Sequence, residues 1–475
     1  FVVPPYNFRI PSNTQKGMAA NMAEKNLSID WKQWYTDHLT DVEGAARYVK
    51  DGDSIWMGQA SEIPYSMLNY LDAHKEDYSN VTLLWNVMNV PNDLIFDHDA
   101  KKHFKMMSAY NLPLERMAIG MGNIECGGTT YDYLQTWPEQ YNCNMLALHV
   151  CPPDENGYCN VGHYGVATNT VINERDFIKK KIAFVDATGQ WPIPGDYEIT
   201  SMHVTEFDRI VEEDTELSEI PAQPPTELDV KIASFILPYI HEGDKVQIGF
   251  GGLGEEILSH LKSIGKLEVY SEVACDNMAK LCEEGVLTKI CASSPGACSK
   301  VFMDFVSKDP RAALRPQSEM IDPLGVIPQE NLVAINATFM CDLIGQCCSE
   351  AQGLSPYSGP GGSFAYIYGT TRSKNGRSFL CLRSTYKDHD GERHSNIVPW
   401  LPEGSIVTTP KVFVMYLVSE WGVADVFCKS IPDRIRAIIK IAHPDYRKEL
   451  MEKIVTTPLI GEDDFEGYDA FDNVK

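Results

Sequence analysis

The chain has 475 residues, of which 44% are hydrophobic and 23% are charged, and its net charge is −25. This length exceeds one ordinary hydrophobic core and predicts two domains, and the composition is that of a globular protein. The negative charge argues against nucleic acid as a partner, because phosphate backbones are bound by basic surfaces. It does not exclude a small anionic ligand, which backbone N–H groups and a few cations can hold.

From the given residues we expect neither a membrane-spanning segment nor a signal peptide. No apolar run reaches the length of about 18 residues that spans a bilayer, and residues 1–28 lack the basic start and apolar centre of a signal peptide. We expect 1–28 to form an extension ahead of the first domain. The 13 cysteines are scattered through the chain, and no pair has C-x-x-C spacing. They predict reduced thiols in a cytoplasmic protein. The lack of a long apolar run predicts no membrane partner.

Two local patterns suggest metal or redox chemistry, and each has a simpler interpretation. His389 and His394 lie in the polar segment Asp388-His-Asp-Gly-Glu-Arg-His, which favours a solvated loop over a metal site. The adjacent Cys347 and Cys348 favour two small buried residues over a redox pair. We therefore expect no metal.

The two halves of the chain share a pattern. Asp51-Gly-Asp-Ser-Ile-Trp-Met-Gly-Gln-Ala is similar to Glu242-Gly-Asp-Lys-Val-Gln-Ile-Gly-Phe-Gly. A helical stretch follows in each half, and then Leu83-Leu-Trp-Asn-Val corresponds to Val269-Tyr-Ser-Glu-Val. The pattern predicts an α/β fold of two similar domains, each opening with strand, turn, helix and strand.

Residues 211–229 separate these halves. The segment is acidic, rich in proline and without a helical or strand period, which is typical of a linker. The predicted organisation is therefore an N-terminal domain over 29–210, a linker over 211–229 and a C-terminal domain over 230–475.

The second half contains the more informative copy of the pattern. A β-prone run over 246–248 precedes a glycine-rich turn, a helical pattern over 255–261 and a strand from Leu267 that ends at Glu272. The turn contains Gly249, Gly251, Gly252 and Gly254. Glycines there let a ligand approach backbone N–H groups, which favour negative charge at the start of a helix. The spacing also fits G-x-G-x-x-G with a distal acid, so a dinucleotide-binding unit and a simple packing turn both stay open.

The two copies differ in their chemistry. Asn86 occupies the first-half position that Glu272 occupies in the second, and the first half has only Gly58 where the second has four glycines. A further cluster, Tyr357-Ser-Gly-Pro-Gly-Gly-Ser-Phe, follows a buried-strand pattern over 332–339. The second copy therefore has the residues expected of a ligand site and the first does not. The two glycine clusters favour a site between the domains.

Several segments, in this order and spacing, resemble the class I coenzyme A (CoA) transferases. The similar group is the single-chain one, with butyryl-CoA:acetate and 4-hydroxybutyrate CoA-transferases and acetyl-CoA hydrolases. The matching segments are Pro152-Pro-Asp-Glu-Asn-Gly-Tyr, the loop over 247–254, Tyr270-Ser-Glu-Val, Ile335-Asn-Ala, Ser358-Gly-Pro-Gly-Gly, Ile397-Val-Pro, Ile406-Val-Thr-Thr, Glu420-Trp-Gly-Val-Ala and Ile441-Ala-His-Pro-Asp-Tyr.

The resemblance implies a fold, a reaction and a set of site residues. It implies two open α/β domains with the active site at their interface, and Glu272 as the nucleophile that forms a glutamyl-CoA thioester in a ping-pong reaction. The implied substrates are a short-chain acyl-CoA such as butyryl-CoA and a free carboxylate such as acetate, in fermentation. A homodimer or higher homo-oligomer is implied as well. The implied CoA contacts are Gln247, Ile248, Gly249, Phe250, Gly251, Phe339 and Gly362.

The chain departs from the family at three places. It has Ser363-Phe-Ala-Tyr where the family often has an aspartate, and Lys411-Val-Phe where Arg-Asn-Asp is common. The segment that begins at Met121 is also unlike the family. Because acyl-pocket residues are expected from such segments, the identity of the two acids stays open. An acyl-CoA hydrolase, an NAD-dependent dehydrogenase and a non-catalytic CoA-binding protein are the alternatives.

The C-terminal region has two clear local patterns. Val412-Phe-Val-Met-Tyr-Leu-Val predicts a buried strand. Residues 433–442 predict an amphipathic helix capped by Ser430. Arg434 and Arg436 are expected in solvent, and contact of either one with a CoA phosphate is the alternative.

Overall fold

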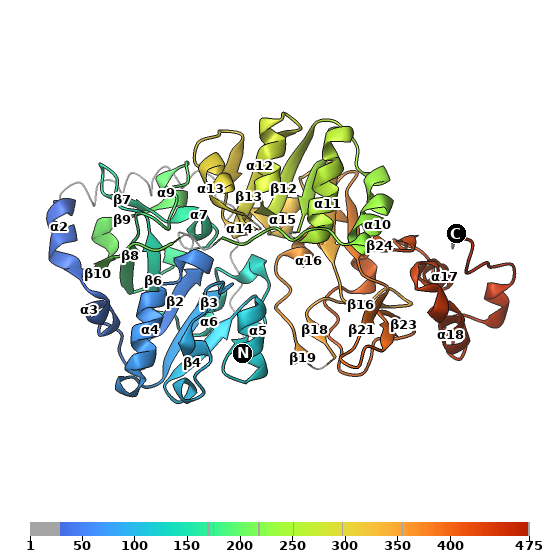
Figure 1. The fold of residues 1–475 in the computed structure, drawn as a ribbon, viewed down its shortest axis with the longest axis horizontal. Helices are drawn as coiled ribbons and strands as arrows, with labels where there is room; N and C mark the ends of the chain where they lie inside the picture. Colours follow the sequence, from blue (N-terminus) through green and yellow to red (C-terminus); the bar gives the residue numbers. More distant parts are fainter. Residues whose placement is uncertain are drawn as a thin grey trace.

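A computed structural model of the chain describes residues 29–168, 172–173, 175–216, 219–249, 251–296, 298–353 and 355–473. Two eight-stranded sheets dominate the fold, one in each half, and helices pack around them (Figure 1). The first sheet has the order β1-β10-β8-β6-β2-β3-β4-β5 and the second β14-β13-β12-β11-β15-β20-β24-β25. All neighbouring strands are parallel except β24 and β25.

The first sheet consists of β1 (Leu39–Thr40), β2 (Ser54–Gln59), β3 (Val81–Asn86), β4 (Phe104–Ser108), β5 (Glu125–Cys126), β6 (Met145–Val150), β8 (Lys180–Val185) and β10 (Arg209–Glu212). The second consists of β11 (Lys245–Ile248), β12 (Leu267–Ala274), β13 (Leu287–Pro295), β14 (Ala312–Leu314), β15 (Leu332–Ala337), β20 (Arg377–Cys381), β24 (Tyr416–Ser419) and β25 (Gly422–Asp425). Strands such as β2 and β6 are apolar along most of their length and buried throughout, as expected for parallel strands covered on both faces.

The helices of the first half are α2 (Trp31–His38), α3 (Val42–Ala46), α4 (Tyr65–Ala73), α5 (Pro113–Gly120), α6 (Trp137–Gln140), α7 (Gly162–Gly165) and α9 (Tyr197–Thr200). Those of the second are α10 (Glu227–Ile236), α11 (Gly252–His260), α12 (Asp276–Glu283), α13 (Lys300–Val306), α14 (Gln317–Met320), α15 (Pro323–Val326), α16 (Ser363–Thr370), α17 (Ile431–Ile441) and α18 (Pro444–Ile454). Small two- and three-stranded sheets lie beside the large ones.

The strand register confirms the internal repeat. Ser54 of β2 is paired with Thr82 of β3, and the equivalent Lys245 of β11 is paired with Glu268 of β12. Asn86 lies as many residues after Thr82 as Glu272 lies after Glu268. The two side chains therefore occupy equivalent positions on β3 and β12. From β5 and from β14, seven strands of each sheet follow the same order, and only the outer strands β1 and β25 differ in their place in the chain and in direction. The mixed α/β fold expected from the sequence is confirmed.

The two halves share one hydrophobic core, and short helical elements make contacts between them: α7 lies against β13, and α14 lies against the turn Tyr131–Tyr133. One hydrophobic cluster contains Trp56, Leu84 and Leu148 of the first half together with Val246, Val269 and Ile335 of the second. A second cluster lies within the first half, and a third lies between β24 and the C-terminal helices α17 and α18. Figure 1 shows these two helices at the end of the molecule remote from the first sheet.

Several predicted boundaries differ from the observed ones. Strand β12 continues past Glu272 to Ala274, because Ala274 still pairs with Pro295 of β13. Helix α11 begins at Gly252, ahead of the predicted start. Within 211–229, β10 extends to Glu212 and α10 begins at Glu227, with the Thr226 side chain as its cap.

The C-terminal predictions had mixed outcomes. Helix α17 is capped by the Ser430 hydroxyl, which accepts from the backbone N–H of Asp433, as predicted. The prediction of a solvated Arg434 was wrong: its guanidinium is buried and donates to three backbone carbonyls. The predicted strand over 412–418 is also wrong in its first part, because a 3-10 turn follows Pro410 and Val412 is 60% exposed.

Among the described residues, no helix combines the length and the apolar character needed to cross a membrane.

Candidate functional site

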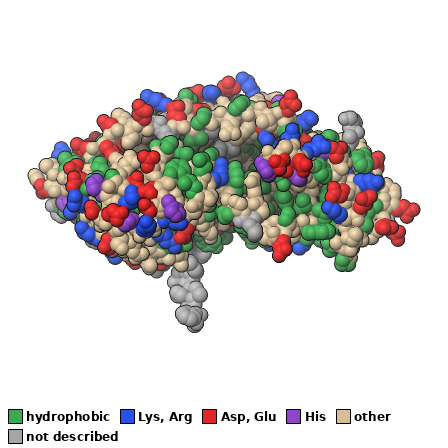
Figure 2. Space-filling view, turned by 60° about the horizontal axis from the view of Figure 1, so that its bottom comes forward, with side chains coloured by type: hydrophobic (Ala, Val, Ile, Leu, Met, Phe, Trp, Pro, Cys, Tyr) green, Lys and Arg blue, Asp and Glu red, His purple; other side chains and the backbone are tan. Residues whose placement is uncertain are grey.

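A cavity of about 440 Å³ lies where the carboxyl ends of β11, β12 and β15 meet the second glycine cluster. The first half contributes Tyr110 to its wall, and the segment after β10 contributes Gln223 and Pro224. The face drawn in Figure 2 is hollowed between the two halves. Ligands bind in such crevices at the carboxyl ends of parallel strands, so this cavity is the candidate site.

Glu272 presents its carboxylate to this cavity from β12. The carboxylate is partly buried, and its Oε2 accepts a hydrogen bond of 2.9 Å from the backbone N–H of Gly362. Loss of solvent raises the pKa of Glu272 to about 7, and the hydrogen bond from Gly362 opposes that rise. No cation is paired with the carboxylate among the described residues. It is therefore a carboxylate whose ionised form is held mainly by one backbone donor.

The glycine-rich turn brings backbone close to the cavity. Gly251 has a φ of 125°, which L side chains rarely adopt, and it precedes α11 directly. A Cβ at Gly252 would lie 2.7 Å from Oδ2 of Asp229, and a Cβ at Gly254 would overlap the carbonyl oxygen of Gly249. These glycines therefore permit a tight turn whose open side, at Gly249 and Gly251, faces free space.

The structure brings the predicted site residues to one place. Gln247, Ile248, Gly249, Gly251, Phe339 and Gly362 line the same cavity as Glu272. Phe250 lies outside the described residues. Sharing a cavity does not assign a role to each residue, so their contacts with CoA stay predictions.

The second glycine cluster contacts the first half closely. The carbonyl of Gly361 accepts from the backbone N–H of Tyr131, and the hydroxyl of Ser358 accepts from the backbone N–H of Asn111. A Cβ at Gly361 would meet the ring of Tyr110 at 3.3 Å and Oε1 of Glu272 at 3.8 Å. The Glu272 carboxylate therefore lies near residues from both halves of the chain.

Sequence reasoning missed the two tyrosines of this interface. Tyr110 and Tyr131 lie with their rings 5.8 Å apart, and the Tyr131 hydroxyl accepts from the side-chain amide of Asn86 at 3.0 Å. Loss of solvent raises the pKa of Tyr110 to about 12, with the charge of Glu272 as a smaller cause, so its hydroxyl stays neutral. The repeat singled out Asn86, and this was the one signal in the sequence that pointed toward the tyrosines.

Aromatic rings form another part of the wall. Phe339 and Tyr357 meet edge to face with their centroids 4.7 Å apart, and the guanidinium of Arg116 lies 4.1 Å from the Tyr357 ring centroid. On the floor, the side-chain amides of Gln247 and Asn336 are hydrogen-bonded to each other at 2.9 and 3.3 Å. These contacts hold the aromatic and amide side chains that shape the cavity.

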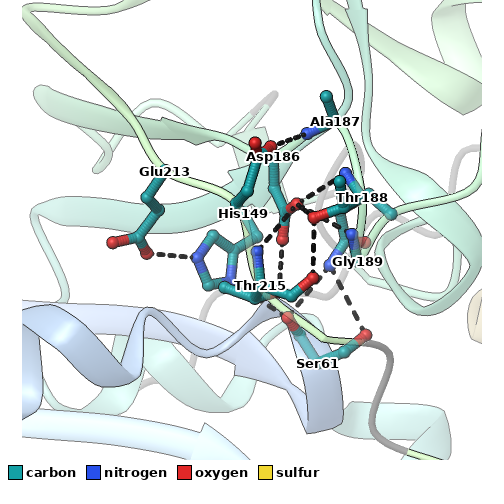
Figure 3. Close-up of polar contacts among 10 residues, drawn as sticks. Ser61, His149, Asp186, Ala187, Thr188, Gly189, Glu213 and Thr215 are labelled. Carbon is teal, nitrogen blue, oxygen red and sulfur yellow. Dashed lines mark hydrogen bonds and ion pairs between the residues drawn. The ribbon is translucent and has the colours of Figure 1, made fainter.

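The corresponding edge of the first sheet is closed by polar side chains (Figure 3). Nε2 of His149 lies 2.6 Å from a carboxylate oxygen of Glu213, and Asp186 accepts from the backbone N–H groups of Thr188, Gly189 and Thr215. Asp186 is fully buried, and its pKa is lowered because these hydrogen bonds outweigh the effect of its burial. This edge holds a satisfied internal network where the second sheet has a cavity.

Ser61 and His163 form a pair that resembles part of a catalytic triad. The Ser61 hydroxyl lies 3.3 Å from Nε2 of His163, and both residues are buried. Burial lowers the pKa of His163 to about 3, so the ring is neutral. Neither residue lines the cavity, so this pair cannot meet a ligand bound there.

The polar segment near His394 forms an antiparallel hairpin of β21 (Thr385–Lys387) and β22 (Arg393–Ser395). Ligand atoms of Asp388, Glu392 and His394 lie within 4.8 Å of one another, with Nε2 of His394 2.7 Å from Asp388. The arrangement is an exposed turn stabilised by its own hydrogen bonds. The absence of a metal stays a prediction.

Comparison with known proteins agrees with the geometry. Residues 298–454 match the family described as "Acetyl-CoA hydrolase/transferase C-terminal domain". The chain is 28% identical over 437 residues to a 4-hydroxybutyrate coenzyme A transferase of Clostridium kluyveri, covering 90% of this chain and 99% of that protein. It is 27% identical over 439 residues to a butyryl-CoA:acetate CoA-transferase of Anaerostipes caccae, covering 89% and 97%.

Solved structures give the same fold. RipA from Yersinia pestis superposes with a TM-score of 0.80 at 24% identity, covering 91% of this chain and all of that one. A 4-hydroxybutyrate CoA-transferase from Porphyromonas gingivalis superposes with a TM-score of 0.73 at 22% identity, covering 90% and 100%. The resemblance stated from the sequence is confirmed.

Proposed function

We propose that the chain, as a member of the family of single-chain CoA-transferases and acetyl-CoA hydrolases, transfers CoA between a short-chain acyl-CoA and a free carboxylate. Its similarity to transferases named for butyryl-CoA, acetate and 4-hydroxybutyrate supports this substrate class. The observation that carries the proposal is the Glu272 carboxylate, which lies in a cavity between two glycine clusters and is paired with no cation among the described residues.

The proposed reaction has two half-reactions. An oxygen of Glu272 attacks the thioester carbonyl, the C–S bond breaks, and a mixed anhydride and the CoA thiolate result. The thiolate then attacks the side-chain carbonyl of Glu272, which releases the first acid and leaves a glutamyl-CoA thioester. A second carboxylate reverses these steps and departs as the new acyl-CoA. Covalent catalysis of this kind replaces one difficult exchange with several easier ones.

The surroundings of Glu272 suit this chemistry. Backbone N–H groups of the turn at Gly249 and Gly251 can stabilise the oxyanion that develops on the attacked carbonyl. Neutral side chains such as Tyr110 border the nucleophile, and the proposed steps, which pass from carboxylate to thiolate and back, require no proton transfer. Packing of both halves around Gly361 limits access of water, which would otherwise hydrolyse the anhydride and the thioester.

The direct test is intact mass spectrometry after brief incubation with acetyl-CoA or butyryl-CoA, followed by peptide mapping. We expect a mass increase of one CoA less one water on the peptide that contains Glu272. Addition of free acetate should discharge the adduct and produce acetyl-CoA.

Two controls give this test its meaning. The Glu272→Ala variant should form no adduct, whereas a Glu319→Gln variant, which changes an exposed ion-paired glutamate of the same half, should form it normally. Failure to form an adduct with any acyl-CoA, together with binding of NAD, would contradict the proposal. Rapid discharge by water without any carboxylate would identify a hydrolase.

The raised pKa of Glu272 predicts the pH dependence of the first half-reaction. Only the ionised carboxylate attacks, so kcat/KM for acyl-CoA should rise about tenfold per pH unit below the pKa of about 7 and level off above it. Stopped-flow measurement of thiolate release between about pH 5 and 8.5 checks this. Tyr110→Phe is the control and should keep the same profile, because the pKa of Tyr110 is about 12. A profile that is flat above about pH 5.5 would show that burial does not control the nucleophile.

A further inference from the structure

One cation lines the candidate cavity. Among the described residues of its wall, Arg383 is the only lysine or arginine, whereas the acids Asp229 and Glu272 both line it. The whole chain carries a net charge of −25. The ligand expected from the proposed function, CoA, carries phosphate groups at its nucleotide end. A strongly acidic protein that binds such a ligand needs a local positive group to offset its own repulsion.

Arg383 lies at the side of the cavity away from Glu272, where a phosphate of CoA would lie if its thioester were at Glu272. Glu272 belongs to β12, and Arg383 lies just beyond β20, which ends at Cys381. The strand order β12-β11-β15-β20 places three strand spacings between them. At about 4.8 Å per spacing they are separated by roughly 14 Å along the sheet edge. The extended pantetheine arm of CoA, which separates the thioester from the phosphates, has a length of this order.

The contacts of Arg383 leave its guanidinium available. Its side chain is 52% exposed, and Nη2 lies 3.4 Å from the Thr226 hydroxyl and 3.7 Å from Oδ1 of Asp229. Neither distance describes a strong hydrogen bond. Asp229 is held instead by the backbone N–H and the hydroxyl of Thr226, at 2.9 and 2.7 Å, in the capping box of α10. The other guanidinium nitrogens have no partner among the described residues.

The internal repeat allows Arg383 to be compared with the residue at the equivalent position of the first half, where the sheet edge is closed. Lys180 pairs with Met145 in the first half, and Arg377 pairs with Val333 in the second. Asp186 lies as many residues after Lys180 as Arg383 lies after Arg377. The two residues therefore occupy equivalent positions in the two halves. Asp186 is the acid at the centre of the closed network in Figure 3. Where the first half has a satisfied buried acid, the second half has an exposed arginine beside a cavity.

We propose that Arg383 binds a phosphate group at the nucleotide end of CoA, at the opposite end of the cavity from Glu272. This inference rests on the proposed function. Guanidinium groups bind phosphate through paired N–H donors, and a charge-assisted pair of this kind is stronger than a neutral hydrogen bond. Binding at a remote phosphate holds the thioester near the nucleophile, so Arg383 is a positioning residue and does not touch the reacting atoms.

The test compares two thioester donors in the same enzyme. Acyl-CoA contains the phosphates, whereas the N-acetylcysteamine thioester of the same acid has only the reacting end. For Arg383→Gln, we expect KM for acyl-CoA to rise about tenfold, while KM for the truncated thioester changes less than about twofold. Arg383→Lys should reverse part of the rise in KM for acyl-CoA, because lysine restores the positive charge but lacks the paired N–H donors of a guanidinium group. The dependence of KM for acyl-CoA on salt concentration should flatten in Arg383→Gln.

Arg47→Gln is the matched control, because it removes another exposed, ion-paired arginine far from the cavity. It should leave both KM values unchanged. Equal KM values for acyl-CoA in the wild type and in Arg383→Gln would overturn the inference. An equal rise of KM for both donors would also overturn it, because it would show that Arg383 only fastens α10 to the second sheet. A wild type that transfers no CoA to any acid would contradict the proposed function instead.

Discussion

Replacement of Glu272 by glutamine should lower the rate of CoA transfer by roughly 10⁴-fold or more, with little change in the affinity for CoA. The amide has nearly the shape of the acid but cannot act as the attacking carboxylate, and removal of a covalent nucleophile is among the most damaging changes to an enzyme. Steady-state transfer between acetyl-CoA and butyrate measures the rate, and isothermal titration with CoA measures the affinity.

The same variant should be more stable than the wild type at alkaline pH. Burial raises the pKa of Glu272 in the folded state to about 7 from an unfolded value near 4.5. The folded protein therefore binds the proton more tightly, so its stability falls as pH rises from about 4.5 to 7 and stays reduced above that. Glutamine removes this cost, which is up to about 3 kcal/mol at pH 8.

Thermal unfolding at two pH values checks the stability difference. Glu272→Gln should melt above the wild type at pH 8 and close to it at pH 5, while Glu319→Gln, at an exposed ion pair, should match the wild type at both. A variant that loses stability at both pH values would show that the carboxylate is structural. Gain of stability with loss of turnover is the pattern of a residue kept for function.

Local sequence patterns predicted most of the elements that build the site. Glycine spacing, the strand over 246–248 and the repeat that pairs Asn86 with Glu272 depend on backbone conformation and on neighbours in the sequence. Such features can be predicted from the chain alone. The exact start of α11 and the end of β12 could not, because they depend on packing against β13 and the segment after β10.

Contacts between distant segments were the part that sequence reasoning missed. Tyr110 has no local motif, and it reaches Glu272 only because the second glycine cluster packs on the first half. Arg434 has the helical position of a solvated residue, yet three carbonyls from separate loops surround it. Val412 belongs to an apolar run, but the turn that begins after Pro410 exposes it. For Arg434 tertiary packing overrode a local helical pattern, for Val412 a turn interrupted an apolar run, and for Tyr110 the sequence held no local pattern at all.

Gly362→Ala tests the geometry of the nucleophile without changing any charged group. The backbone φ at Gly362 is −97°, which alanine adopts without strain, so the effect of the substitution is steric. A Cβ there would lie closer than 3.0 Å to Oε2 of Glu272 and 2.5 Å from Cγ2 of Ile321. Ile321 is fully buried, so the carboxylate is the group that can move. Displacement by about 1 Å should lower kcat roughly 100-fold.

The pH profile distinguishes this effect from simple misfolding. When the carboxylate moves, it loses the hydrogen bond from the Gly362 N–H, which opposes the rise in its pKa. The apparent pKa of the first half-reaction in Gly362→Ala should therefore shift above 7. The control is Gly120→Ala at the end of α5, where a new Cβ meets nothing within 4 Å and the melting temperature should stay within about 2 °C of the wild type. A Gly362→Ala enzyme with the wild-type rate and pH profile would show that Glu272 acts from another position, and the hydrogen bond to Gly362 would then have no part in catalysis.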